Sequence, residues 1–178
     1  MGQELRTAQI REFLDTVGNQ LVAPAQLIIV GGSGLNLLGN DRPTLDLDYE
    51  GEESEVNELR TLMEKVALEL HIELEAVPLQ RFIPIPSGAS KRHVLIGRFG
   101  DLEVLVFDPY SIALSKLDRG FDSDIEDVLF LLRHGFVDSN ELAALLSGLT
   151  RELVAQYDLD LGQMRVHLDL AQAALGLD

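Results

Sequence analysis

The stretch from Leu21 to Asn40 constrains the fold most, because it contains no charged side chain over 20 residues. A helix that spans a membrane has about this length. The run Leu27–Val30 is typical of a buried strand, and the leucines that follow are typical of a short helix ending near Gly39. Polar residues and helix breakers interrupt the stretch, namely Pro24, Gln26, Asn36 and four glycines. The sequence therefore predicts a strand, a glycine turn and a helix rather than a membrane span.

Composition limits the class of protein. The chain has 178 residues, of which 46% are hydrophobic, and this suits one folded domain with a substantial core. Because it contains no cysteine, a disulfide scaffold, a thiolate metal site and a cysteine nucleophile are excluded. The net charge of −16 argues against sequence-general binding of nucleic acid, which needs a basic surface. The polar segment Gln3–Arg6 is unlike a signal peptide, and we expect a cytoplasmic protein.

The spacing of apolar residues predicts an α/β (α+β) fold, with mixed strands and helices followed by helices alone. The expected helices cover residues 5–17, 53–70, 110–118, 123–134, 139–147 and 150–174, and the expected strands cover 27–30, 45–50, 71–77, 81–85, 93–98 and 102–107. We expect a mixed-sheet core with its N-terminal helix over residues 1–136. A helical C-terminal extension over residues 137–178 is expected to pack on that core.

Two carboxylates stand out on the strand expected at residues 45–50. Asp46 and Asp48 are two residues apart, so both side chains project from the same face. A divalent cation would relieve their repulsion, and Mg²⁺ prefers one or two carboxylates together with phosphate oxygens of a substrate. The upstream turn Gly31–Ser33 offers backbone N–H groups, a hydroxyl and a helix N-terminus, all suited to a phosphate. The alternative is a solvent-facing strand edge after an ordinary turn.

The order and spacing of these segments resemble the nucleotidyltransferases of the polymerase-β-like fold. That family has an apolar residue and Gly-Gly or Gly-Ser, then Asp-apolar-Asp/Glu-apolar. Val30-Gly31-Gly32-Ser33 and Asp46-Leu47-Asp48-Tyr49 match this signature. Arg42-Pro43-Thr44 also resembles the Arg-x-Thr-x-Asp box of a narrower group, the minimal nucleotidyltransferases related to bacterial AbiEii-type toxins. The resemblance implies a mixed-sheet nucleotidyltransferase core.

Downstream segments are similar to the same group. Leu102–Pro109 resembles the family strand that contributes a third carboxylate. The family's Lys…Arg…Asp-x-x-Asp helices are matched by Lys116, Arg119, Asp124 and Asp127. The resemblance covers roughly residues 26–134, and the later helices share only a general character.

The resemblance implies transfer of a nucleoside monophosphate from an NTP, such as ATP, to a hydroxyl of RNA or protein, with Mg²⁺ or Mn²⁺ as cofactor. It implies that Asp46, Asp48 and a third carboxylate bind the metal. Glu103 is favoured as the third ligand because it lies inside the apolar run, and Asp101 on the same face is the alternative. The implied nucleotide contacts are Gly31, Gly32, Ser33, Arg42, Thr44, Lys116, Asp124 and Asp127.

Simpler roles stay open for the charged residues. Lys116 and Arg119 are expected near the end of a helix, where cations are favoured by the helix dipole alone. Asp124 and Asp127 lie three apart on a helix and could pair with those cations. The basic run Lys91–His93 could grip a phosphate or an acceptor nucleic acid, or be a solvated loop.

The main hypothesis is an active nucleotidyltransferase of a bacterial toxin–antitoxin or phage-defence system. A catalytically degenerate module of the same fold, which binds a nucleotide or a partner, is the alternative, because many relatives have Asp where Glu103 stands. A purely structural interaction protein is a third hypothesis. The apolar faces of the C-terminal helices are expected to be core, or to bind an antitoxin or a second copy.

Overall fold

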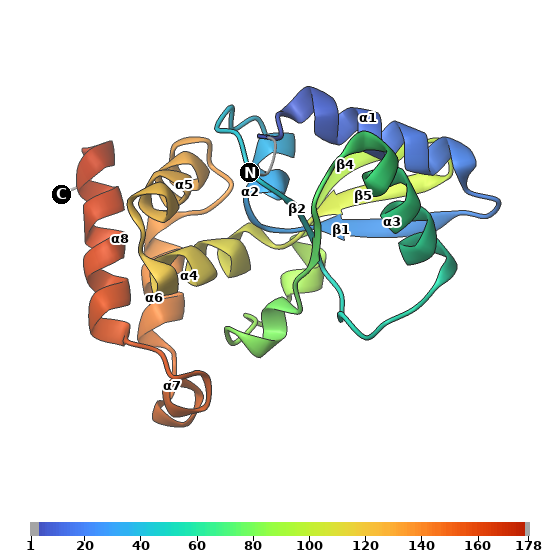
Figure 1. Cartoon of the computed structure of the whole chain (residues 1–178). Coiled ribbons are helices and arrows are strands. Elements are labelled where there is room, and N and C mark those ends of the chain that lie inside the picture. The colour runs from blue at the N-terminus through green and yellow to red at the C-terminus, as the bar shows by residue number, and fades with distance from the viewer. Residues whose placement is uncertain (1–3, 177–178) are drawn as a thin grey trace. The chain divides into compact units, whose positions relative to one another are not determined.

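The computed structural model describes residues 4–176 (Figure 1). The chain forms two compact units. The first comprises residues 1–78 and 93–107, and the second comprises residues 79–92 and 108–178. The boundary expected between residues 136 and 137 stays a prediction.

The first unit is built on a five-stranded mixed sheet. Its strands are β1 (Ala25–Ile29), β2 (Leu47–Tyr49), β3 (Leu74–Ala76), β4 (Val94–Phe99) and β5 (Leu102–Val106), and its helices are α1 (Thr7–Gln20), α2 (Gly31–Leu37) and α3 (Glu58–Leu70). The strand order is β3-β2-β1-β5-β4. Strand β1 runs parallel to β5 and antiparallel to β2, while β2 runs parallel to β3. The strand and the helix predicted between Leu21 and Asn40 are confirmed, but the glycines expected to form a turn between them are the first residues of α2.

One face of this sheet is buried. Alternate residues of β1 and β5, such as Leu27 and Val104, are almost inaccessible to solvent. Helix α1 turns Phe13 and Val17 into the same core, and it packs against β4, β5 and α3. Residues of the opposite parity, such as Glu103, are only half-buried. The polar candidates on the strands lie on this second face.

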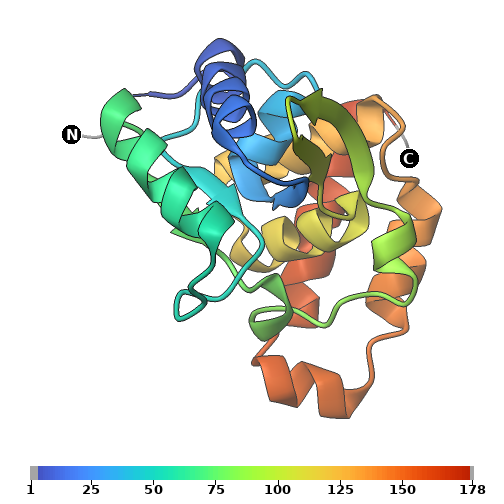
Figure 2. The same ribbon diagram turned by 90° about the vertical axis from the view of Figure 1, so that its right-hand side faces the viewer.

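The second unit consists of helices. They are the 3₁₀ turns η1 (Leu79–Arg81) and η2 (Ala89–Lys91), followed by α4 (Pro109–Arg119), α5 (Asp122–Arg133), α6 (Ser139–Ser147), α7 (Arg151–Tyr157) and α8 (Leu161–Leu175). Helix α8, red in Figures 1 and 2, lies beside α4, α5 and α6. The predicted mixed α/β fold is confirmed, with several C-terminal helices that pack together.

Two predicted elements are wrong, and the residues at fault explain why. No strand forms at residues 81–85, where Pro84 and the nearby Pro86 cannot donate to a ladder. The helix expected at 150–174 is two helices, because Asp158 adopts a left-handed conformation (φ +53°) and Asp160 caps α8. An alternating or helical pattern in a sequence does not reveal such breaks.

Several elements start later than predicted, among them α3 and β2. Helix α3 begins at Glu58 instead of residue 53, because Asn57 caps it by accepting a hydrogen bond from the Arg60 N–H. Val56 is therefore 85% exposed. Strand β2 begins at Leu47 instead of residue 45, which leaves Leu45 59% exposed outside the buried face.

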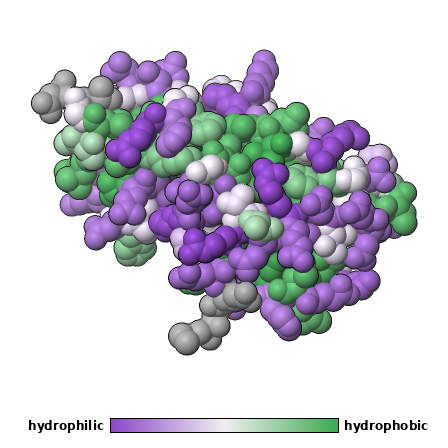
Figure 3. All heavy atoms as spheres, turned by 90° about the horizontal axis from the view of Figure 1, so that it is seen from above, coloured by the Kyte–Doolittle hydropathy of each residue, from purple (hydrophilic) through white to green (hydrophobic). Residues whose placement is uncertain are grey.

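Large apolar side chains on the surface are scattered. In the view of Figure 3, polar side chains (purple) separate smaller apolar groups (green). The exposed large apolar residues of the described chain are Val22, Leu45, Val56, Leu68, Phe82, Leu95, Phe121, Val166 and Leu170. No helix within residues 4–176 is both long enough and apolar enough to cross a membrane.

Candidate metal centre

The junction of β1 and α2 brings the chain close to the Asp48 side chain. Val30 is extended, and Gly31 then turns the chain with a φ of +60°. A Cβ at position 31 would lie 2.1 Å from Asp48 Oδ2. A glycine is needed here for both its backbone conformation and its missing side chain. The carboxylate consequently rests against the main chain at the start of α2.

Ser33 fixes this junction from inside. Its side chain is fully buried, its Oγ donates to the Val30 carbonyl at 3.1 Å, and its Oγ accepts from the Asp48 N–H at 3.0 Å. The Val30 N–H donates to the Asp48 carbonyl at 3.0 Å. The Ser33 hydroxyl is therefore engaged within the protein, where it holds α2 to β2. Its predicted contact with a phosphate stays a prediction.

The loop before Asp46 is held by Asn36, a residue that the sequence did not single out. Asn36 is 2% exposed, and its Nδ2 donates to the Gly32 carbonyl at 3.1 Å and to the Arg42 carbonyl at 2.8 Å. At the end of the loop, Thr44 Oγ1 donates to Asp46 Oδ1 at 3.3 Å. A lone amide inside an apolar helix was the available signal, because a buried amide needs hydrogen-bond partners.

Three carboxylates meet on the open face of the sheet. One oxygen each from Asp46, Asp48 and Glu75 lies within 4.8 Å of the other two. Asp48 and Glu75 are neighbours because β2 and β3 pair with these residues in register. The two aspartates are half-buried and Glu75 is exposed. Hard oxygen donors clustered in this way suit Mg²⁺ or Mn²⁺, which would offset the repulsion among them.

Glu103 lies on the same face at another place. Strand β1 pairs with both β2 and β5. Through these two pairings Asp48 lies beside Phe107, which directly follows β5 and is four residues beyond Glu103. Four residues of strand span about 13 Å. Glu103 instead accepts from Gln26 Nε2 at 2.8 Å and lies 4.0 Å from an Arg98 nitrogen. Asp101 is still farther along, so the structure brings neither of them to the aspartates.

Glu75 is the carboxylate that sequence reasoning missed. It lies in the strand expected at residues 71–77, between the apolar residues Leu74 and Ala76. The alternation put it on a polar face, but only the pairing of β3 with β2 shows that this face is shared with Asp48. Strand order is not visible in a single sequence, so no local signal could have identified Glu75 as the neighbour.

Lys116, Asp124 and Asp127 form an ion cluster in the second unit. Lys116 Nζ lies 2.7 Å from Asp127 and 3.2 Å from Asp124, and all three side chains are at most 5% exposed. Arg119 adds a contact of 2.6 Å to Asp124. The predicted pairing of these residues with one another is confirmed. A role for them in nucleotide binding stays a prediction.

The basic run at residues 91–93 is also engaged. Arg92 donates to both carboxylate oxygens of Asp108 at 2.8 Å, and its guanidinium lies 5.4 Å from the centre of the Tyr110 ring. The hydrogen bonds to Asp108 raise the pKa of Arg92 above its ordinary value. The His93 ring lies against Phe107, at 4.6 Å between centroids. Of this run, Lys91 is the residue exposed to solvent.

Comparison with known proteins adds one match. A family model described as a nucleotidyltransferase of unknown function (DUF6036) matches residues 6–165, which include the three clustered carboxylates. No curated protein and no solved structure matches the chain.

Proposed function

The chain belongs to the DUF6036 nucleotidyltransferases, and from this premise we propose that it transfers a nucleoside monophosphate from an NTP to a hydroxyl, with Mg²⁺ or Mn²⁺ bound at Asp46, Asp48 and Glu75. The observation that carries the proposal is the convergence of these carboxylates inside the region that the family model matches. Glu75 replaces Glu103 as the proposed third ligand, because it is the carboxylate next to Asp48.

The reaction needs charge neutralisation at a triphosphate. The acceptor oxygen forms a bond to the α-phosphorus, the bond from that phosphorus to the bridging oxygen breaks, pyrophosphate leaves, and the hydroxyl proton is released. A bound divalent ion would supply charge stabilisation of the phosphates and make the acceptor hydroxyl more acidic. The two half-buried aspartates would hold this ion, and the exposed Glu75 would add a third carboxylate ligand.

The residues around the carboxylates set the approach of the substrate. Because Gly31 and Gly32 have no side chains, the Asp48 carboxylate and the Thr44 hydroxyl lie against the start of α2, beside which a metal-bound phosphate would come. The main chain of Thr44 is fixed through paired hydrogen bonds with Leu5, and Asn36 fixes that of Arg42. We therefore keep Gly31, Gly32, Arg42 and Thr44 as nucleotide contacts.

The acceptor is a protein hydroxyl rather than free RNA. The net charge of −16 opposes the approach of a polyanion, and Arg92 of the basic run is already paired with Asp108. A toxin–antitoxin or phage-defence role, in which one protein modifies another, is compatible with this acceptor. The nucleotide is left open between ATP and the other NTPs.

A second candidate function is a nucleotide-binding module without transfer. It is favoured by the exposure of Glu75, which leaves the third ligand in open solvent where it binds a metal weakly. In that case the protein binds NTP and Mg²⁺ but produces no labelled product.

The test is transfer of label from each NTP carrying radioactive phosphorus at the α position, with Mg²⁺ or Mn²⁺, to total protein and to total RNA. We expect labelled protein with the wild type and none with the double variant Asp46→Asn/Asp48→Asn. Asp15→Asn, the same change at an exposed site on α1, is the matched control and retains labelling. Binding of NTP without transfer to either pool would favour the second function. Label on RNA would correct the acceptor.

A further inference from the structure

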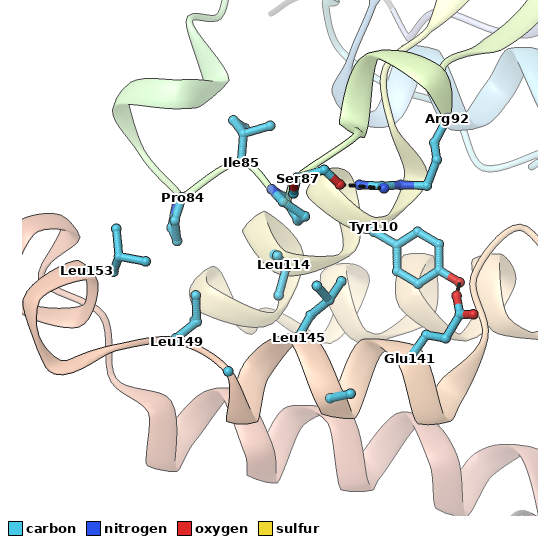
Figure 4. A pocket seen from close by; sticks show the side chains of 13 residues that line it. Pro84, Ile85, Ser87, Arg92, Tyr110, Leu114, Glu141, Leu145, Leu149 and Leu153 are labelled. Carbon is cyan, nitrogen blue, oxygen red and sulfur yellow. Dashed lines mark hydrogen bonds between the residues drawn. The ribbon is translucent and has the colours of Figure 1, made fainter.

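The second unit contains a cavity of about 530 Å³ that the proposed chemistry does not use (Figure 4). Its floor is formed by Tyr110 and Leu114 of α4, and α6 and the segment Pro84–Ser87 form its walls. Leu149 and Leu153 close the end toward α7. The volume falls within the range of cavities that hold ligands, and the lining is mainly apolar.

The cavity is held open by hydrogen bonds at both ends of its outer wall. Tyr157 of α7 donates through its hydroxyl to the Gln80 carbonyl at 3.1 Å. Arg92 donates to the Ser87 carbonyl at 2.9 Å and is itself fixed by Asp108. A wall tied down at both ends does not have to order itself on binding, which lowers the entropic cost of an occupant.

The inner wall is one face of α6. Glu141, Ala144, Leu145 and Gly148 are spaced by three and four residues, so they lie along one side of the helix. From Glu141 to Gly148 this side extends about 10 Å. The small side chains in it, Ala144 and Gly148, let another backbone approach closely. The cavity is therefore a groove with the length of about two helical turns, and we refer to it below as the groove.

The outer wall excludes one common way of binding a peptide. Pro84 and Pro86 have no N–H group, so this wall cannot pair with an added β-strand. Binding has to come from side chains that enter the apolar groove. An amphipathic helix presents such side chains at spacings of three and four residues, which match the spacing of the α6 face.

The charged side chains at the groove indicate which charge the bound helix should carry. The carboxylate of Glu141 accepts a hydrogen bond from the Tyr110 hydroxyl and also interacts electrostatically with Arg92. Because Asp108 already neutralises Arg92, these three charged side chains together leave one net negative charge at this end of the groove. Residues 137–178 contain seven acidic and two basic side chains. We propose that this groove docks a short amphipathic helix of a partner protein, with apolar side chains toward Leu114 and Leu145 and with Lys or Arg beside Glu141.

The proposal does not depend on nucleotidyl transfer. It is tested by titrating ¹⁵N-labelled full-length protein with two synthetic helical peptides that share the same leucine positions and carry either Lys or Glu elsewhere. The Lys peptide is expected to shift amide signals of Ile85, Ser87 and residues 141–153, and to bind at least about tenfold more tightly than the Glu peptide. Saturable binding with these shifts supports the groove.

Three variants distinguish binding in the groove from general attraction to an acidic protein. Ala144→Glu places a longer charged side chain in the groove at an exposed helical position, and we expect it to weaken binding of the Lys peptide by about tenfold. Ala173→Glu is the identical change at an exposed position of α8 outside the lining, and should leave binding unchanged. Glu141→Gln, which can still accept from Tyr110, should weaken binding several-fold.

Other outcomes overturn the proposal. Equal strengthening by the two Glu variants would show adsorption by charge alone, and no saturable binding up to roughly millimolar peptide would remove the site. Shifts of the same signals by ATP would assign the cavity to a nucleotide. Shifts that depend on protein concentration without peptide, with a dimer in sedimentation, would assign it to a second copy of the chain.

Discussion

The carboxylate of Asp48 lies in the space that a side chain at Gly31 would need. The Oδ2 atom of Asp48 is 2.1 Å from where a Cβ would be at position 31. This relationship links the glycine turn and the acidic strand, which are 17 residues apart in the sequence. The two halves of the predicted motif are thus a single arrangement, because one half leaves the room that the other occupies.

Gly31→Ala should therefore damage both stability and the metal centre. We expect a loss of about 1–3 kcal/mol in the free energy of unfolding, from the left-handed backbone and the displaced carboxylate, together with weaker binding of Mn²⁺. Gly135→Ala is the control, since Gly135 has a φ of +72° and open space around its Cβ position. Urea denaturation and calorimetric titration measure the two effects. Equal losses in both variants with unchanged metal affinity would contradict the steric argument.

Neutralising the third carboxylate distinguishes the two candidates for it. Glu75→Gln should weaken Mn²⁺ binding by about tenfold, because one charged oxygen next to Asp48 is lost. Glu103→Gln should leave the Mn²⁺ affinity unchanged, because position 103 lies about 13 Å along the sheet from Asp48. The new amide can still accept the hydrogen bond from Gln26. Calorimetric titration of both variants provides the comparison. The reverse order of effects would restore Glu103 as the ligand.

The sequence was sufficient for the parts of the fold that depend on local pattern. The uncharged run around Leu27–Val30 and the alternation around the aspartate pair each have a periodicity that few structures share, and β1 and β2 form close to where they were expected. Asp46 and Asp48 are correspondingly together in the structure.

The remaining features depend on contacts between distant residues. Glu75 becomes a neighbour of Asp48 through the pairing of β3 with β2, which no local pattern encodes. Asn36 gains its role from a loop that folds back onto α2. In the sequence, Pro84 and Pro86 interrupt a strand-like run. That they line the wall of a groove opposite α6 is visible only in the folded structure.

Removing the buried cation of the second unit should be costly. Lys116→Met leaves Asp124 with Arg119 and leaves Asp127 buried without its ion pair to Lys116. We expect a loss of about 3–5 kcal/mol, because a buried carboxylate that loses its ion pair is strongly destabilising. Arg119→Gln should cost less than about 1 kcal/mol, since the Arg119 side chain is 55% exposed.

Urea denaturation at neutral pH measures both variants. The second change Asp127→Asn, added to Lys116→Met, removes the negative charge of the buried carboxylate and should recover part of the lost stability. If the two single variants lose equal stability, the cluster contributes through exposed attraction rather than through burial.

Alkaline pH should lower the free energy of unfolding, because Tyr110 ionises. Burial, and then the hydrogen bond to Glu141, raise the pKa of the Tyr110 hydroxyl above its ordinary value of 10.0. Between the pKa of the unfolded chain and that of the folded chain, the folded chain keeps a proton that the unfolded chain has lost. The stabilising contribution of Tyr110 is therefore fully present below pH 10.0 and is lost as the pH rises through the pKa of the folded chain.

Tyr110→Phe should lower the free energy of unfolding by about 1 kcal/mol at neutral pH through the lost hydrogen bonds. It should also make the alkaline decline shallower, although Tyr49, whose pKa is likewise raised by burial, retains part of it. Urea denaturation from neutral to strongly alkaline pH measures the slope, and an unchanged slope in the variant would show that Tyr110 ionises equally easily in both states.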